Sequence, residues 1–341
     1  MDKVSLLETL TGTLGVSGFE DEITSLLKSH VEKLGFKTWT DRLGSLIAHK
    51  EGAGPRVMVV AHMDEIGFVV RYLDDKGYLY LTRVGGVNPR TLPGARVVVW
   101  SRGGPLEGVI GEKPIHRMKE DELKKAPELD KLFVDLGLPA DQVKEKVRRG
   151  DPVSFKPNFT VLGGDKVASK SLDDRLGCLT LLLIAESVKS ERLPVDLYLV
   201  FSAREEVGLE GARTAAFEIN PEVAIAVDVT HAGDHPTLDE KEAPVKLGEG
   251  PVISRGAAPD NKVTDVLIEA AERSGVKYQL EAEGGRTGTD IDAVRLVRAG
   301  VRAGLVSLPL RYMHTPSEVG SISDAWNAAK LIAEFLAQWK L

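Results

Sequence analysis

The sequence predicts an α/β fold, with a mostly parallel sheet flanked by helices and a small β-rich domain inserted into it. Two observations lead to this prediction. Continuous apolar runs, typical of strands that are covered on both faces, alternate with segments of helical periodicity. In the middle of the chain, this alternation gives way to short strands among many glycines and prolines. A length of 341 residues leaves room for about two domains.

The first segments are predicted to be helices that precede the sheet. Leucines follow helical spacing over 6–10, and apolar residues return to that spacing over 23–34. A loop with two glycines lies between them, and Ser17 or Asp21 is expected to begin the second helix.

Four continuous apolar runs are predicted to be buried parallel strands with helices between them. The runs cover 56–61, 196–202, 223–227 and 304–308, and the helices cover 176–188, 262–274 and 290–298. Because strands and helices alternate, the sheet is expected to be mostly parallel. Residues 1–65 and 162–341 are therefore assigned to one discontinuous α/β domain.

Residues 66–161 are assigned to the inserted β-rich domain. Alternating strands are predicted at 67–72 and 78–82, joined by a hairpin-like turn at 74–77. A charged helical stretch at 123–147 is expected to interrupt the strands.

Composition and charge exclude several classes of protein. The formal net charge of -7 argues against binding to nucleic acid or to an anionic membrane, because both need concentrated positive charge. Cys178 is the only cysteine, which excludes an internal disulfide and a cysteine-based zinc finger. Neither a membrane span nor a signal peptide is recognisable, so a cytoplasmic protein is expected. Few glutamines among many charged residues favour a thermophilic source.

Acidic residues and histidines gather where the predicted strands end. His62 and Asp64 follow the first buried strand. Glu205 and Glu206 follow the second, and Asp228 lies within the third apolar run. In an open α/β sheet, ligands bind beyond the carboxyl ends of the strands. A carboxylate inside an apolar run needs a partner or a metal, because an unpaired buried charge is costly.

Two further positions complete the candidate set. Asp173 and Asp174 are adjacent just before an apolar helix, where they either cap the helix or need a nearby cation. His314 follows the last predicted strand. Each signal alone has an ordinary explanation, such as a turn or a solvated strand end. Together, oxygen and nitrogen donors without cysteine fit two divalent cations that share one carboxylate, a pair suited to hydrolysis with Glu205 as the free carboxylate for proton transfer.

The ordered set of motifs resembles that of the M42 metallo-aminopeptidases, which include the glutamyl and deblocking aminopeptidases and the TET particles. The motifs are His62-x-Asp64, Asp173-Asp174-Arg175-x-Gly177, Glu205-Glu206-Val207-Gly208-x-x-Gly211-Ala212, the run around Asp228 and Arg311-Tyr312-Met313-His314-Thr315-Pro316. The likeness covers nearly the whole chain, including 15–20 and 150–153. No single motif is specific, but their order is.

The resemblance implies a metal centre with two divalent ions, Zn²⁺ or Co²⁺. His62 and Asp228 would each bind one or other ion, and Glu206 and His314 would complete the two sites. Asp173 would bridge the ions.

The resemblance also implies the remaining roles at this centre. Glu205 would be the general acid/base, and Asp64 would orient His62. The bridging aspartate would be joined to its neighbour by an unusual cis peptide, although the residues leave open whether Asp173 or Asp174 is the bridge.

Substrate and assembly follow from the resemblance too. The substrates would be peptides with a free N-terminus. The inserted domain would pair subunits, so that a homo-oligomer, a hollow dodecamer built from dimers, is expected. Arg286 lies beside the Gly-Thr-Asp segment of the family, and Arg255 lies in a region that lines the substrate pocket of relatives. Either would bind an acidic side chain or the peptide carboxylate, unless both are ordinary surface arginines. The preferred N-terminal residue stays open.

An aminopeptidase is the leading hypothesis, and three alternatives remain. A dinuclear amidohydrolase or deacylase of N-acyl amino acids would use the same metals. A glycosidase would use two carboxylates without a metal. A structural shell protein would keep the fold without catalysis. Substrates with free and with blocked N-termini separate the first two hypotheses.

Overall fold

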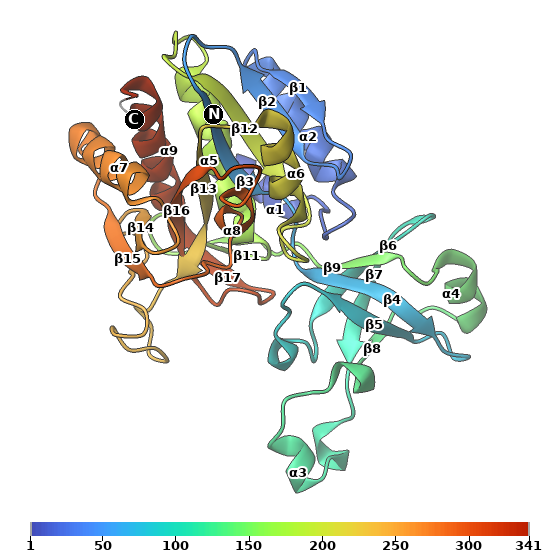
Figure 1. Ribbon diagram of the computed structural model, residues 1–341. Coiled ribbons are helices and arrows are strands. Elements are labelled where there is room, and N and C mark those ends of the chain that lie inside the picture. The colour runs from blue at the N-terminus through green and yellow to red at the C-terminus, as the bar shows by residue number, and fades with distance from the viewer. Residues whose placement is uncertain (1, 340–341) are drawn as a thin grey trace.

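The computed structural model describes residues 2–339 and shows two bodies beside each other (Figure 1). One is an 11-stranded sheet with helices on both faces, and the other is a closed barrel built from β4, β5, β8, β7, β6 and β9. Separate clusters of buried apolar side chains fill the two bodies. The α/β class with a β-rich insertion is therefore present.

The sheet is parallel in its centre and antiparallel toward its edges. Its main path runs through β1 (Lys37–Thr40), β2 (Leu46–Lys50), β12 (Asp196–Ser202), β3 (Arg56–His62), β13 (Val223–His231), β16 (Arg302–Arg311), β17 (Glu318–Ser321), β11 (Lys166–Ser169) and β10 (Thr160–Val161). A branch adds β14 (Val252–Gly256), antiparallel to β16, and β15 (Gln279–Glu283), parallel to β14. Only β12, β3, β13 and β16 form the continuous parallel core.

A mostly parallel sheet was expected, and the sheet is instead mixed. The four parallel strands are the continuous apolar runs that the sequence makes visible. The flanking strands are short and less uniformly apolar, and several join their neighbours through short connections, which favour antiparallel pairing.

Helices cover both faces because side chains of the central strands alternate between two cores. Val57, Val59 and Ala61 of β3 point into one core, and Met58 and Val60 into the other. The first core is closed by α1 (Lys3–Gly12), α2 (Asp21–Lys33), α5 (Leu172–Val188), α7 (Asn261–Ser274) and α9 (Ile322–Ala337). The second is closed by α6 (Glu210–Ile219) and α8 (Ile291–Val294).

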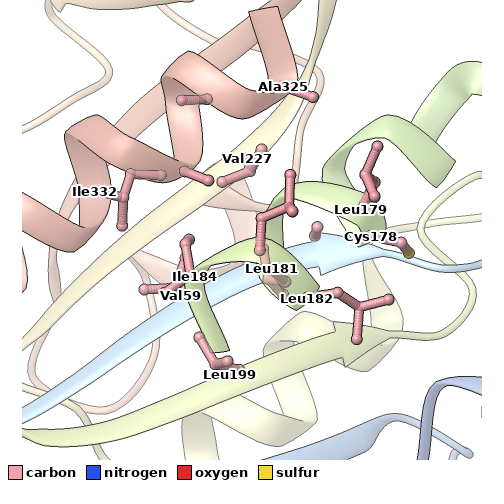
Figure 2. Packing of buried hydrophobic residues seen from close by; sticks show 14 of the residues in the cluster. Val59, Cys178, Leu179, Leu181, Leu182, Ile184, Leu199, Val227, Ala325 and Ile332 are labelled. Atoms are coloured by element: carbon pink, nitrogen blue, oxygen red, sulfur yellow. The ribbon is translucent and has the colours of Figure 1, made fainter. Parts of the chain in front are cut away.

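Helix α5 lies between the sheet and α9. Figure 2 shows Leu181 and Ile184 of α5 packed among Val59, Val227 and Ile332, which come from β3, β13 and α9. Almost every residue of α5 is buried, which explains the continuous apolar run at 181–185. This packing fixes the start of α5 against the carboxyl ends of the parallel strands.

The barrel contains β4 (Gly67–Leu73), β5 (Leu79–Val84), β6 (Arg96–Ser101), β7 (Gly104–Gly111), β8 (Phe133–Asp135) and β9 (Pro152–Phe155). Phe68 and Phe155 meet edge to face in its core, with ring centroids 5.6 Å apart. The predicted turn between β4 and β5 is present, and the Asp74 side chain accepts the backbone N–H groups of Lys76 and Tyr78. The boundaries at 66 and 161 stay a prediction.

Two predicted helices are shorter than expected. The stretch 123–147 holds the end of α3 (Glu120–Leu123), a 3-10 turn at Leu129–Lys131, β8 and α4 (Ala140–Lys146) instead of one helix. The segment 290–298 is helical only in α8. Two further 3-10 turns lie at Pro89–Thr91 and Ile115–Arg117. Within residues 2–339, no helix combines the length and apolar character that crossing a bilayer requires.

Candidate active site

The candidate site lies at the edge of the sheet where the parallel strands end. The register pairs Ala226 of β13 with Val60 of β3, which puts Asp228 level with His62 on the neighbouring strand. The segment that follows β16 brings His314 to the same edge. Because these strands are parallel, their carboxyl ends collect side chains that lie far apart in the sequence.

Two groups of side chains meet at Asp173. Its Oδ1 lies 2.9 Å from Nε2 of His62, and that nitrogen lies 3.9 Å from Oδ1 of Asp228. Its Oδ2 lies 3.2 Å from Nε2 of His314, which lies 3.3 Å from Oε1 of Glu206. Within each group, the potential ligand atoms all lie within 4.8 Å of one another. The structure thus brings together five residues that the sequence singled out, with one oxygen of Asp173 toward each group.

Asp173 reaches both groups because the backbone leaves helical geometry at the start of α5. Asp173 has φ -78° and ψ 106°, and the peptide bond between Asp173 and Asp174 is cis, as the resemblance implied. The Asp174 side chain turns elsewhere: its Oδ1 accepts the N–H of Gly177 at 2.9 Å. Of the two adjacent aspartates, Asp173 is the one that both groups share.

Asp64 holds the segment that carries the two glutamates. Its carboxylate accepts the backbone N–H of Glu205 at 3.0 Å and of Glu206 at 3.2 Å, and the hydroxyl of Ser17 at 2.5 Å. Nδ1 of His62 hydrogen-bonds to the carbonyl oxygen of Asp64 at 3.2 Å, whereas the Asp64 carboxylate lies 3.6 Å away. The sequence predicted that Asp64 contacts His62, but it did not predict the hydrogen bonds from the Glu205 and Glu206 backbone to Asp64.

Burial and close like charges perturb the ionisable groups of this cluster. Burial raises the pKa of Asp228 to about 8, and burial also raises the pKa of Glu205 well above its usual range. Although burial acts in the opposite direction, hydrogen bonds from His314 and His62 lower the pKa of Asp173. Burial alone would lower the pKa of His314, but its hydrogen bonds to Asp173 and Glu206 raise this pKa to about 11.

This donor set fits divalent cations. Buried carboxylates that face one another are stable when cations neutralise them, and the same carboxylates and imidazoles must lose protons to become ligands. Carboxylate oxygens and imidazole nitrogens are both common ligands of divalent metal ions in proteins. Glu205 belongs to neither ligand group.

The cluster opens into a cavity of about 570 Å³. Arg286 is among its lining residues, with a side chain 84% exposed and Nε 3.9 Å from Oδ2 of Asp292. Arg255 is not among the described lining residues, and its Nη1 lies 2.9 Å from Oδ1 of Asp265. A role in substrate binding stays a prediction for both arginines.

Sequence reasoning missed one residue of this site. Glu318, 1% exposed, accepts the backbone N–H of Asp173 through Oε2 at 3.1 Å and the N–H of His314 through Oε1 at 2.8 Å. The only available signal was an acidic residue four positions after His314.

Comparisons with known proteins agree with this site. Residues 44–331 match the family described as M42 glutamyl aminopeptidase. The chain belongs to this family. The lysyl aminopeptidase of Pyrococcus furiosus is 36% identical over 98% of this chain and 97% of its own. The solved aminopeptidase of Desulfurococcus kamchatkensis superposes with a TM-score of 0.92 at 37% identity, over 98% of this chain and 94% of that one.

A third relative is described together with its assembly. The TET1 peptidase of Pyrococcus horikoshii has a TM-score of 0.87 at 29% identity over 99% of this chain and 100% of that one. It is described as able to assemble into a tetrahedron or a large octahedral shell. Membership of the M42 family makes this protein a peptidase, which hydrolyses peptides from the N-terminus, and the family is metal-dependent.

Proposed function

We propose that this M42 member is a dinuclear-metal aminopeptidase that removes N-terminal amino acids from short peptides with a free α-amine. The observation that carries the proposal is the sharing of Asp173 by two ligand groups. One Zn²⁺ or Co²⁺ ion would be held by His62, Asp173 and Asp228, and the other by Asp173, Glu206 and His314.

Glu205 is proposed to move the proton in this reaction. Two divalent cations supply Lewis acidity for the scissile carbonyl and lower the pKa of water. Glu205 lines the same cavity as the ligands and is itself outside both ligand groups. Its carboxylate takes the proton of the attacking water and donates it to the leaving amine. Burial, which raises the pKa of Glu205, suits a carboxyl group that must hold a proton between the two steps.

The test is chelation followed by reconstitution with Zn²⁺ or Co²⁺. Activity should vanish with the metal and return with two ions per chain, on aminoacyl anilides and peptides with a free N-terminus. The same compounds with an acylated N-terminus should stay intact. Preferential cleavage of the acylated compounds would instead favour a deacylase, and chelator-resistant activity on oligosaccharides a glycosidase.

Glu205→Gln tests the proton transfer separately from metal binding. The variant should keep two ions per chain, because Glu205 belongs to neither ligand group, and should lose at least about 10²-fold in kcat. Glu210→Gln is the matched control, since Glu210 is a half-exposed residue at the start of α6. Near-normal kcat in metal-loaded Glu205→Gln would contradict the assignment.

We also propose that the chain forms a homo-oligomer, a dodecamer built from dimers that pair through 66–161. Two observations support this proposal. The Pyrococcus horikoshii relative is described as able to assemble into a tetrahedron or a large octahedral shell. The insertion also exposes large apolar side chains, among them Tyr72, Val109, Ile115 and Leu123.

A further inference from the structure

Strand β15 places two carboxylates in the cavity beside the proposed metal ligands. Glu281 and Glu283 are two residues apart, so their side chains leave the same face of the strand. Both line the cavity that also contains His62 and Asp173. Neither residue belongs to a ligand group.

Glu281 is connected to the metal-ligand strand through Thr230. The Thr230 hydroxyl donates to the Glu281 carboxylate, with oxygen–oxygen distances of 3.1 and 3.0 Å. Thr230 follows Asp228 by two residues on β13, which puts both on one face about 7 Å apart along the strand. The Glu281 carboxylate therefore lies farther along the cavity than the proposed ligand Asp228. A long substrate side chain that starts at the ligand cluster would reach it.

The two carboxylates have no cationic partner within residues 2–339. None of the salt bridges of this part of the chain involves Glu281 or Glu283. The arginine nearest to them along the chain, Arg286, is 84% exposed and lies toward Asp292. Burial raises the pKa of Glu283, and the negative charges of Glu281 and Asp292 add to this effect. The cavity thus holds two carboxylates, one of them partly desolvated, that form no ion pair with a cationic side chain of the described residues.

We propose that Glu281 and Glu283 bind a basic N-terminal side chain, so that the preferred substrates are peptides that begin with lysine or arginine. This inference rests on the proposed function, which brings the substrate α-amine and scissile carbonyl to the ligand cluster. A lysine or arginine side chain then extends toward β15 and supplies the missing positive charge. An acidic side chain is repelled there, and an apolar one leaves both carboxylates unpaired.

The first experiment compares aminoacyl anilides on the metal-loaded full-length protein. The side chains are those of lysine, arginine, norleucine, leucine and glutamate, and norleucine matches the lysine stem without the charge. We expect kcat/KM for lysine and arginine to exceed that for norleucine at least about tenfold, as for hydrogen bonds to a charged group. Preference for norleucine, leucine or glutamate would overturn the inference while leaving the aminopeptidase intact. No cleavage of any free-amine substrate would overturn the proposed function itself.

The second experiment assigns the preference to these residues. Glu281→Gln keeps an oxygen acceptor for Thr230 and removes the charge, and Glu283→Gln is its counterpart. Each should lower the lysine-to-norleucine ratio of kcat/KM about tenfold, because only the lysine substrate loses a countercharge. Glu272→Gln, an exposed position on α7, is the matched control.

A binding measurement keeps the test independent of turnover. Calorimetry should show that free L-lysine binds the metal-loaded wild type more tightly than L-norleucine, and that Glu281→Gln narrows this difference. Circular dichroism and metal content confirm that each variant is folded and loaded. An unchanged lysine preference in folded Glu281→Gln and Glu283→Gln would overturn the assignment.

Discussion

At the scale of single residues, Glu318 holds the backbone of two proposed metal ligands. Glu318 receives the N–H groups of Asp173 and His314, one on each carboxylate oxygen. Only a carboxylate accepts hydrogen bonds at both ends of a side chain of this length, because an amide has one accepting and one donating end. Glu318 therefore sets the distance between two ligands that come from separate elements.

Replacing Glu318 by Gln should weaken metal binding without touching a ligand. The amide nitrogen would face a backbone N–H group and displace Asp173 or His314. We expect about a 10–100-fold loss of metal affinity, as for other residues that support ligands from outside the coordination shell. Competition with a chromogenic chelator measures the affinity, and the exposed Glu191→Gln is the control. Wild-type affinity in Glu318→Gln would show that the ligands hold their places without it.

The sequence predicts the parts of the site that follow apolar strands, but not the parts that depend on contacts between distant residues. His62, Glu206 and Asp228 stand at the ends of recognisable apolar strands, and parallel strands must bring such ends together. The role of Glu318 depends on a hydrogen bond to a residue 145 positions away, which no local spacing encodes. The shared position of Asp173 depends in the same way on the non-helical backbone where α5 starts.

At the scale of elements, the sequence identified the continuously apolar strands and missed the short strands at the sheet edges. The four core strands are recognisable because both of their faces are covered. The edge strand β1 has partly exposed side chains, and β10 consists of two exposed residues, so neither carries a hydrophobic pattern. In 123–147, the charged residues lie on the surface of short elements, and β8 contributes Val134 to the barrel core.

The start of α9 depends on an acidic residue outside the helix. The Asp165 carboxylate accepts the Ser321 hydroxyl at 2.5 Å and the N–H of Ser323 at 3.2 Å. Although burial raises it, these hydrogen bonds leave the pKa of Asp165 below its ordinary value. A carboxyl group whose pKa is lower in the folded state stabilises the fold above its unfolded pKa, and this stabilisation is lost as the pH falls through the folded pKa.

Asp165→Ala should therefore destabilise the protein in a pH-dependent way. At pH 7 we expect a loss of about 1 kcal/mol, the usual effect of removing a helix cap. The difference from wild type should start to shrink as the pH falls below about 4. Urea unfolding between pH 7 and pH 3.5 measures this difference, with the exposed Asp75→Ala as control. A difference that stays constant over this range would mean that the charge of Asp165 contributes nothing.

At the scale of the whole molecule, both bodies border the candidate site. The proposed ligands and Glu205 lie on the α/β body, whereas Gly85 and Gly86, in the segment after β5, approach the side chains of Glu206 and His314 closely. A Cβ at Gly86 would lie 2.6 Å from Nδ1 of His314, so only glycine fits there. The inserted region thus closes one side of the site, so the arrangement of the two bodies shapes the surroundings of Glu206 and His314.

The proposed pairing through 66–161 predicts which surface substitutions separate subunits. Ile115 and Leu123 lie on the arm between β7 and β8 and are 63% and 49% exposed. If this arm lies in the dimer interface, the double variant Ile115→Glu with Leu123→Glu buries two carboxylates there. It should break the pairing and yield species smaller than the wild-type assembly in analytical ultracentrifugation. The matched control, Leu296→Glu with Leu238→Glu, changes exposed leucines of the α/β body and should still contain dimers or larger species. All four side chains are exposed in the single chain, so neither variant should change the stability of the subunit itself. When both are compared as subunits of the same oligomeric state, their urea midpoints should equal that of the wild type. An arm variant that keeps the wild-type mass would place the subunit contact elsewhere.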